Sequence, residues 1–284
     1  MTWVRILTAV VLIPAVIGVI WWGTPVLVAA LAALVVLLAL LEFFALGERA
    51  GLHGYRFWTC AVAVAMLLQQ WETSRAERTS LTRDIVLLHQ PPGFTPSLQF
   101  LLVIFVIGAA ILAVFGRAPL TDILSDISIS SAALLFIAMP FSLVIRIDAV
   151  NSRLLLFALA MIWVGDTLAY FVGRWFGHFK LAPQLSPNKT WEGAVANLFG
   201  SLVVAVLLAR WVGIEKVHMV AMACLGNLGG QLGDLLESAY KRSAGAKDSG
   251  SLLPGHGGIL DRIDALVLSI PLVWYYFELV VARQ

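Results

Sequence analysis

The chain has 284 residues, of which 60% are hydrophobic and 13% are charged, about half the charged fraction of a typical soluble protein. A soluble globule with a mean hydropathy of +0.91 would expose large apolar patches to water, which excludes that class. The net charge of +2 provides no global field that would favour nucleic acid as a partner. The composition therefore predicts an all-α, polytopic membrane protein.

Apolar runs divide the chain into membrane-spanning segments. A bilayer core of about 30 Å requires roughly 20 apolar residues in a helix, and runs near that length predict nine spans. They cover residues 6–23, 25–46, 57–71, 98–116, 127–147, 153–173, 193–213, 217–236 and 263–282. The third run is short and the fifth carries charges at both ends, so a count that differs by one is the alternative.

The first apolar run, 6–23, resembles the hydrophobic region of a signal peptide. A second run follows almost at once, and the small residues that resemble a cleavage site, Ala30 and Ala32, lie inside it. We therefore expect an uncleaved first span. If the amino end is cytoplasmic, the loops on the cytoplasmic side carry slightly more Lys and Arg than the loops on the opposite side. This weakly favours that orientation, because cytoplasmic loops are enriched in these residues.

Residues 72–97 form a polar stretch with Arg75, Arg78 and Arg83 and a Pro-Pro-Gly turn, and are predicted to be an extramembrane loop. We divide the chain into residues 1–150, a membrane region of about five helices that includes this loop, and residues 151–284, a second membrane region.

The connection before the last span, residues 238–264, departs from the apolar composition. It carries Lys241, Arg242, Lys247, Asp248, Asp261, Arg262 and Asp264, together with glycines at 245, 250, 255, 257 and 258. Glycine lets backbone N–H groups approach an anion closely, and the basic residues add full positive charge. This composition indicates a phosphate site; a solvated loop that contacts anionic lipid head groups is the alternative.

Carboxylates flank this loop on both sides. Asp234 and Glu237 close the eighth span, and Asp261 and Asp264 open the ninth. Mg²⁺ binds through one or two carboxylates plus substrate phosphates, so the pattern predicts a magnesium site. In the alternative, Asp261 and Asp264 complement the positive amino end of the last helix. That alternative does not explain Asp234, which is expected at the carboxyl end of the eighth span, where the helix dipole disfavours an anion.

Asp166 lies inside the sixth span, where an uncompensated carboxylate costs roughly 2.5–3.5 kcal/mol. It should face the bundle interior or water; a hydrogen-bonded interhelical carboxyl is the alternative. The following loop carries Lys189, Thr190 and Glu192. Lys189 and Thr190 precede a helix and are placed to meet a phosphate, although Thr190 as a simple helix cap is equally consistent.

Gly226, Gly229, Gly230 and Gly233 give the eighth span small-xxx-small spacing, which predicts the close approach of another helix. His256 stands between glycines. It is interpreted either as a general acid or base, or as a hydrogen-bond partner of a phosphate or of the loop.

The polar and glycine positions of this loop resemble the defining motif of the phosphatidate cytidylyltransferase family, also called CDP-diacylglycerol synthases. The matching residues are Ser238, Lys241, Arg242, Lys247, Asp248, Gly250, Pro254, His256, Gly257, Gly258, Asp261, Arg262 and Asp264. The segments WVGDTLAYFVGRWFG, SPNKTWEG and GDLLES also resemble that family. The resemblance covers about residues 153–270, and the amino half resembles the family in its membrane spans alone.

The resemblance implies a transferase of phospholipid biosynthesis in which CTP and phosphatidate give CDP-diacylglycerol and pyrophosphate. The lipid phosphate is already an anionic nucleophile, so the barrier lies in bringing anions together at the α-phosphorus, which a metal and cationic side chains relieve. Mg²⁺, a second, monovalent cation such as K⁺, and a homodimer are implied as well. Because CTP is cytosolic, the site is expected to face the cytoplasm from a bacterial inner membrane.

The resemblance also assigns roles by position. The expected metal ligands are Asp234 and Asp261, supported by Asp264 and Asp248. The expected catalytic set is these four residues with Lys241, Arg242 and Lys247. The expected substrate-binding set is Asp166, Lys189, Thr190, Glu192, Ser238, His256, Gly257, Gly258 and Arg262.

Three other activities are considered. A related nucleotidyl or kinase-like enzyme acting on another membrane alcohol phosphate would use the same loop. A transporter predicts charges spread at mid-bilayer and broken helices in both halves, whereas here charge is concentrated on one side of the carboxyl half. CDP-alcohol phosphotransferases carry a motif beginning Asp-Gly, a dipeptide that this sequence lacks.

Overall fold

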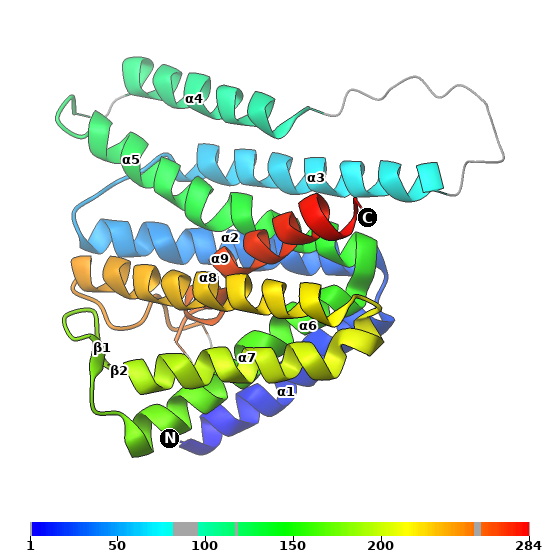
Figure 1. Ribbon diagram of the computed structural model, residues 1–284. Coiled ribbons are helices and arrows are strands. Elements are labelled where there is room, and N and C mark those ends of the chain that lie inside the picture. Colours follow the sequence, from blue (N-terminus) through cyan, green and yellow to red (C-terminus); the bar gives the residue numbers. More distant parts are fainter. Residues whose placement is uncertain (1, 82–95, 117–118, 253–256, 284) are drawn as a thin grey trace.

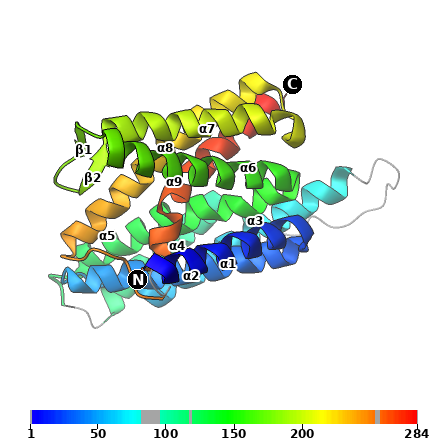
Figure 2. The same cartoon turned by 90° about the horizontal axis from the view of Figure 1, so that it is seen from below.

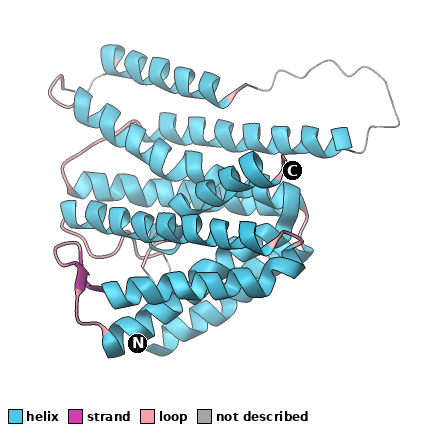
Figure 3. Ribbon diagram, in the orientation of Figure 1, coloured by secondary structure: helices cyan, strands magenta, loops and turns pink. Residues whose placement is uncertain are grey.

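The computed structural model describes residues 2–81, 96–116, 119–252 and 257–283, with side chains from residue 10 onward and, in the third helix, up to residue 75. Helices make up nearly all of this described part, and its sheet is one two-stranded hairpin (Figure 3). The all-α class predicted from the composition is therefore confirmed.

The order of the helices along the chain can be followed in Figure 1. The amino half contains α1 (Thr2–Trp22), α2 (Pro25–Arg49), α3 (Arg56–Leu81), α4 (Leu98–Phe115), α5 (Ile123–Ala133) and a π-helical segment (Leu134–Ala138). The carboxyl half contains α6 (Met139–Phe176), β1 (Lys180–Ala182), β2 (Ser186–Thr190), α7 (Trp191–Val212), α8 (Lys216–Ser243), α9 (Leu260–Tyr276) and a second π-helical segment (Phe277–Val281).

Five helical segments of the described residues are long and apolar enough to cross a membrane. They are Pro25–Arg49, Leu98–Phe115, Ile123–Phe176, Trp191–Val212 and Leu260–Val281. This agrees with a polytopic membrane protein. Each of the nine predicted spans overlaps a helix, but two of them share the continuous run 123–176. The count of nine membrane crossings stays a prediction.

Asn151 interrupts the long run between the two predicted spans that it contains. Its backbone is extended, with φ −159° and ψ 100°. The side-chain Oδ1 accepts hydrogen bonds from the N–H groups of Arg153 (3.0 Å) and Leu154 (3.3 Å), as a residue that caps a new helix does. The helical run therefore changes direction where the apolar pattern predicts a loop.

The helix α3 is longer than the apolar run that predicts it. Residues 72–81, expected at the start of the extramembrane loop, continue the helix to Leu81. These residues include Glu, Arg and Ala, which are good helix formers, and no Gly or Pro occurs there to end the helix. The remainder of the expected loop, residues 82–95, lies outside the described residues.

Glycines bring α8 and α9 into close contact. A Cβ atom on Gly229 would lie 2.8 Å from the Leu268 carbonyl oxygen, and one on Gly233 would collide with the Asp264 carbonyl oxygen. On the same helix, a Cβ on Gly230 would meet Ile162 of α6 at 2.7 Å. The predicted close approach of another helix to these glycines is confirmed, and it brings the ends of α8 and α9 together.

Three connections that carry polar residues meet at one end of the bundle. The β1–β2 hairpin and the carboxyl ends of α2 and α8 lie on the left in both Figure 1 and Figure 2. The hairpin pairs Lys180 with Thr190 and Ala182 with Ser186 in antiparallel register. Segments far apart in sequence therefore share one end of the molecule.

Candidate active site

The hairpin brings Lys189 to the carboxylate of Asp234 on α8, with 2.5 Å between Nζ and Oδ2. The pair is partly accessible, because 26% of the Lys189 side chain and 32% of the Asp234 side chain are exposed. The helix α8 continues to Ser243, so Asp234 does not lie at the carboxyl end where the sequence placed it, and the helix dipole, which acts within the last turn, does not disfavour it. Its carboxylate is paired with the Lys189 ammonium. Two residues that the sequence places in separate segments thus form one charged pair.

Thr190 and Glu192 hold the start of α7. Thr190 Oγ1 accepts a hydrogen bond from the Gly193 N–H at 3.1 Å, so Thr190 caps this helix. Glu192 Oε1 accepts hydrogen bonds from the N–H groups of His178 (3.0 Å) and Phe179 (3.2 Å). Both side chains therefore fix the hairpin that presents Lys189, and the capping interpretation of Thr190 is confirmed.

Asp166 is bonded across the α6–α7 interface, and its side chain is accessible from outside the protein. Asn197 Nδ2 donates to Asp166 Oδ1 at 2.9 Å, so the interhelical hydrogen bond considered as an alternative is present. Lys189, Asp234 and Arg262 also lie close enough to Asp166 to interact with it electrostatically. The four charged groups come from α6, β2, α8 and α9.

Lys241 and Asp261 form a second charged pair, which is largely buried. Lys241 Nζ lies 2.6 Å from Asp261 Oδ1 and also pairs with Glu237, whose side chain is fully buried. Asp261 Oδ2 accepts hydrogen bonds from the Gly258 N–H (2.7 Å), the Ser249 N–H (2.9 Å) and the Ser249 hydroxyl (2.9 Å). The loop backbone thus wraps around the Asp261 carboxylate.

Two of the glycines expected to approach an anion, Gly257 and Gly258, lie against this carboxylate. Gly257 has φ 78°, in the left-handed region that favours glycine, and a Cβ there would lie 2.5 Å from Asp261 Oδ2. The N–H of Gly258, which was expected to face a phosphate, donates to Asp261. In this structure the anion held by the two glycines is a side chain of the protein itself.

The other predicted residues lie around these two pairs. Asp264 is partly buried, and Asp234 and Glu237 lie close enough to interact with it electrostatically. Arg242 donates to the carbonyl oxygens of Leu185 (3.2 Å) and Ala246 (3.2 Å), which ties the hairpin to the end of α8. Ser238 is buried, whereas Lys247, Asp248 and Arg262 are exposed. His256 lies outside the described residues.

Sequence reasoning missed Glu42 on α2. Its carboxylate accepts hydrogen bonds from Ser249, Ile259 and Leu260, at 2.9–3.0 Å. A signal was available, since a carboxylate inside the apolar run 25–46 is as costly as Asp166 is in its own span. The buried side-chain amides of Asn197 and Asn227 and the partly buried amide of Gln231 were missed as well.

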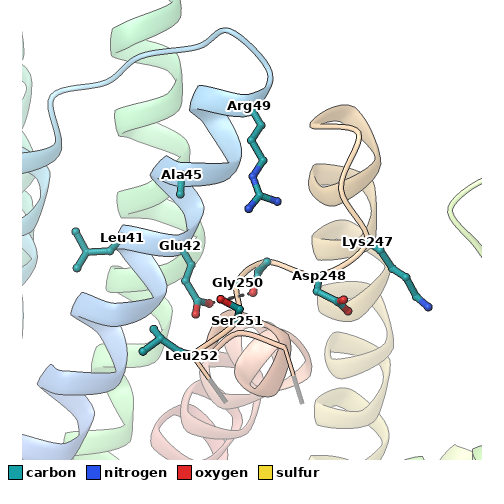
Figure 4. Close-up of a pocket in the computed structure, with 10 residues that line it drawn as sticks. Leu41, Glu42, Ala45, Arg49, Lys247, Asp248, Gly250, Ser251 and Leu252 are labelled. Carbon is teal, nitrogen blue, oxygen red and sulfur yellow. Dashed lines mark hydrogen bonds between the residues drawn. The ribbon is translucent and has the colours of Figure 1, made fainter. Parts of the chain in front are cut away.

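A pocket of about 780 Å³ lies between α2 and the loop that follows α8. Figure 4 shows Glu42 and Arg49 pointing from α2 toward this loop, whereas Lys247 points away from α2. Arg49, Lys247 and Asp248 line the pocket and are exposed, and Glu42 lies buried at its base. The charged residues of the lining are therefore two cations and two carboxylates.

The donor set suits a hard cation although the carboxylates are not clustered. Within the described residues, no group of three or more His, Cys, Asp or Glu side chains is arranged to hold a metal ion. Mg²⁺ does not need such a group of protein ligands, since it is commonly bound by one or two carboxylates plus substrate phosphates. Asp234 and Asp261 each pair with a lysine at the same end of the bundle. Asp234 is partly exposed and is the more accessible oxygen donor, whereas the buried Asp261 carboxylate has partners on both oxygens.

Comparison with known proteins shows the family of this chain. The model of the cytidylyltransferase family matches residues 3–280. A phosphatidate cytidylyltransferase of Brucella abortus is 36% identical over 239 residues, which cover 78% of this chain and 84% of that protein. Proteins of the same name from Haemophilus influenzae (42% over 130 residues; 44% of this chain, 45% of that protein) and Staphylococcus saprophyticus (46% over 121 residues; 42% and 46%) are also similar. The family match extends through both halves of the chain, and the chain belongs to the cytidylyltransferase family.

Proposed function

We propose that this chain is a phosphatidate cytidylyltransferase, which converts CTP and phosphatidate into CDP-diacylglycerol and pyrophosphate for phospholipid biosynthesis. The observation that carries the proposal is the pair of lysine–carboxylate contacts, Lys189–Asp234 and Lys241–Asp261, at one end of an apolar helical bundle. A reaction between two anionic phosphates, one of them on a lipid, needs cations and carboxylates at such a membrane edge. The similar bacterial proteins carry this name.

In this reaction a phosphate oxygen of phosphatidate attacks the α-phosphorus of CTP. A P–O bond forms between them, and the bond from the α-phosphorus to the bridging oxygen of the β-phosphate breaks, so that pyrophosphate leaves with the electron pair. No proton has to be removed from a nucleophile that is already ionised. The lysines lower the repulsion between the two anions and stabilise the charge that develops on the leaving group.

Mg²⁺ is proposed to be held by Asp234 and Asp261, with Asp264 and Asp248 in support and a monovalent cation such as K⁺ nearby. When bound, the metal supplies charge stabilisation at the phosphoryl oxygens. Arg262, Lys247 and Lys241 are proposed to contact the triphosphate or the lipid phosphate. Asp166 and Ser238 are proposed to complete the substrate site with His256.

The site is proposed to face the cytoplasm from a bacterial inner membrane, because CTP is cytosolic. Nine membrane crossings with the motif loop between the last two, and a homodimer in the bilayer, belong to the same proposal. A cysteine at the exposed Ser251 tests the orientation. It should react with a membrane-impermeant thiol reagent in inverted vesicles and stay unlabelled in intact cells with a permeabilised outer membrane.

The activity is tested with the purified full-length protein, phosphatidate, Mg²⁺ and each of four labelled nucleoside triphosphates. We expect label from CTP alone to enter the lipid, and we expect Asp261→Asn to abolish the transfer in a folded protein. Asp122→Asn, on the connection before α5, is the matched control. Transfer to another lipid phosphate but not to phosphatidate would identify a related nucleotidyltransferase instead.

A further inference from the structure

Glu42 is a charged residue inside an apolar helix that the proposed reaction does not use. It is 6% exposed, and among the described residues no Lys, Arg or His forms an ion pair with it. Its carboxylate is instead surrounded by hydrogen-bond donors of the motif loop and of α9. A buried carboxylate with such partners is costly unless every donor stays in place, so Glu42 and the loop depend on each other.

Glu42 supplies the cap that α9 lacks in its own sequence. The first N–H groups of a helix have no partner within it, and Ile259, which precedes α9, provides no side-chain cap. Glu42 Oε1 accepts from the Ile259 N–H at 3.0 Å and Oε2 accepts from the Leu260 N–H at 2.9 Å. An anion is also favoured there by the helix dipole. The amino half thus fixes where α9, and with it Asp261, begins.

Ser249 connects Glu42 to Asp261. The Ser249 hydroxyl oxygen lies 2.9 Å from Glu42 Oε2 and 2.9 Å from Asp261 Oδ2. A hydroxyl has one proton to donate, so the two carboxylates converge on a shared donor. A displacement of Glu42 would therefore be transmitted to Asp261 both through Ser249 and through the start of α9.

The glycines of the motif leave room for Glu42. A Cβ on Gly250 would lie 2.6 Å from Glu42 Oε1, and one on Gly258 would collide with Glu42 Oε2 and the Ser249 hydroxyl. Side chains cannot be accommodated at either position without displacing the carboxylate. Part of the glycine pattern is thus explained by a residue on α2, in the amino half of the chain.

We propose that Glu42 is a positioning residue of the active site, which holds the Asp261 carboxylate and the loop after α8 in their working arrangement from the amino half of the chain. The inference rests on the proposed function, because that function is what makes Asp261 and the loop part of an active site. Glu42 acts through Ser249 and the first turn of α9, which are the groups that its carboxylate contacts.

The test compares Glu42→Gln with Glu48→Gln in the purified full-length protein. Gln keeps the shape of Glu42 but places an NH₂ group among donors. Glu48 lies on the same helix, is 39% exposed and pairs with Arg56 at 2.7 Å, so its substitution is a matched control. In Glu42→Gln we expect kcat to fall by about tenfold or more, as misplacement of a catalytic group does, with the KM for CTP nearly unchanged. Hydrogen exchange at the amides of residues 259 and 260 should become faster.

A folded Glu42→Gln protein with the kcat of the native enzyme would overturn the proposal, and so would unchanged exchange at residues 259 and 260. Ser249→Ala provides a second measurement if Glu42→Gln does not fold, because it removes the shared hydroxyl and leaves the cap on α9. A native kcat in that variant overturns the link to Asp261. If both variants fold, the loss in the double variant should be smaller than the product of the single losses.

This design separates the inference from the proposed function. If the native protein transfers no nucleotide to phosphatidate, the proposed function fails. The exchange measurement still decides whether Glu42 holds the start of α9, because it does not depend on activity.

Discussion

Asn197 donates a hydrogen bond of 2.9 Å from Nδ2 to Asp166 Oδ1 across the interface of α6 and α7. The bond belongs to a chain of side chains within the bundle. Asn227 Nδ2 donates to Asn197 Oδ1 at 2.6 Å and to the Ser201 hydroxyl at 2.8 Å, and Gln231 Nε2 donates to Asn227 Oδ1 at 2.7 Å. This ladder orients Asp166 toward the charged groups of the active site.

Asn197→Ala should destabilise the protein by about 1–3 kcal/mol, because it leaves buried polar partners without hydrogen bonds. Unfolding by heat or denaturing detergent, followed by circular dichroism, measures the change. Asn188→Ala, at an exposed position of β2, is the control and should leave the midpoint of unfolding nearly unchanged. Equal midpoints for the two variants would show that the ladder contributes nothing to stability.

Lys189→Gln should weaken substrate binding while leaving stability almost unchanged. The pair with Asp234 is partly exposed, so its loss should cost at most about 1 kcal/mol of the free energy of unfolding. We expect the KM for CTP or phosphatidate to rise by about tenfold, equivalent to about 1.4 kcal/mol of binding free energy. Steady-state kinetics measure both constants. Lys180→Gln, on β1 of the same hairpin, is the control, and the same kinetics in both variants would contradict the role of Lys189.

Gly233→Ala should force α8 and α9 apart, because the added Cβ would collide with the Asp264 carbonyl oxygen. Overpacking of this kind costs about 1–3 kcal/mol, and activity should fall further because Asp264 moves relative to Asp234. Gly18→Ala is the control: its Cβ would make an ordinary contact of 3.7 Å with Trp22, and Ala is the better helix former. A Gly233→Ala protein with native activity and unfolding midpoint would contradict this account of the interface.

Arg49→Gln should raise the KM for an anionic substrate by about tenfold, because Arg49 contributes positive charge to the rim of the pocket beside Glu42. The effect should shrink as salt is added, since exposed charges are screened. The KM values for CTP and phosphatidate are measured separately at two ionic strengths. Arg56→Gln, which removes the partner of Glu48, is the control. If neither KM changes in Arg49→Gln, the pocket does not bind a substrate.

The sequence predicts the helices well where lipid burial dictates them, and less well where polar residues take part. Asn151, a polar residue between two apolar runs, marks the break in the helical run 123–176. The end of α3 was placed too early, because helix propensity continues after hydropathy falls. The hairpin was expected as a loop, since its strands are short and carry no alternating apolar pattern.

Composition and motif by themselves determined the environment, the fold class and the neighbourhood of the site. Long apolar helices are required because lipid cannot satisfy backbone polar groups, and glycines with bases and acids in one loop indicate phosphate chemistry. The tertiary structure alone decided which lysine pairs with which carboxylate. It also decided that Glu42 caps α9. Those contacts join residues up to 218 positions apart, and they depend on how helices pack, which local patterns do not encode.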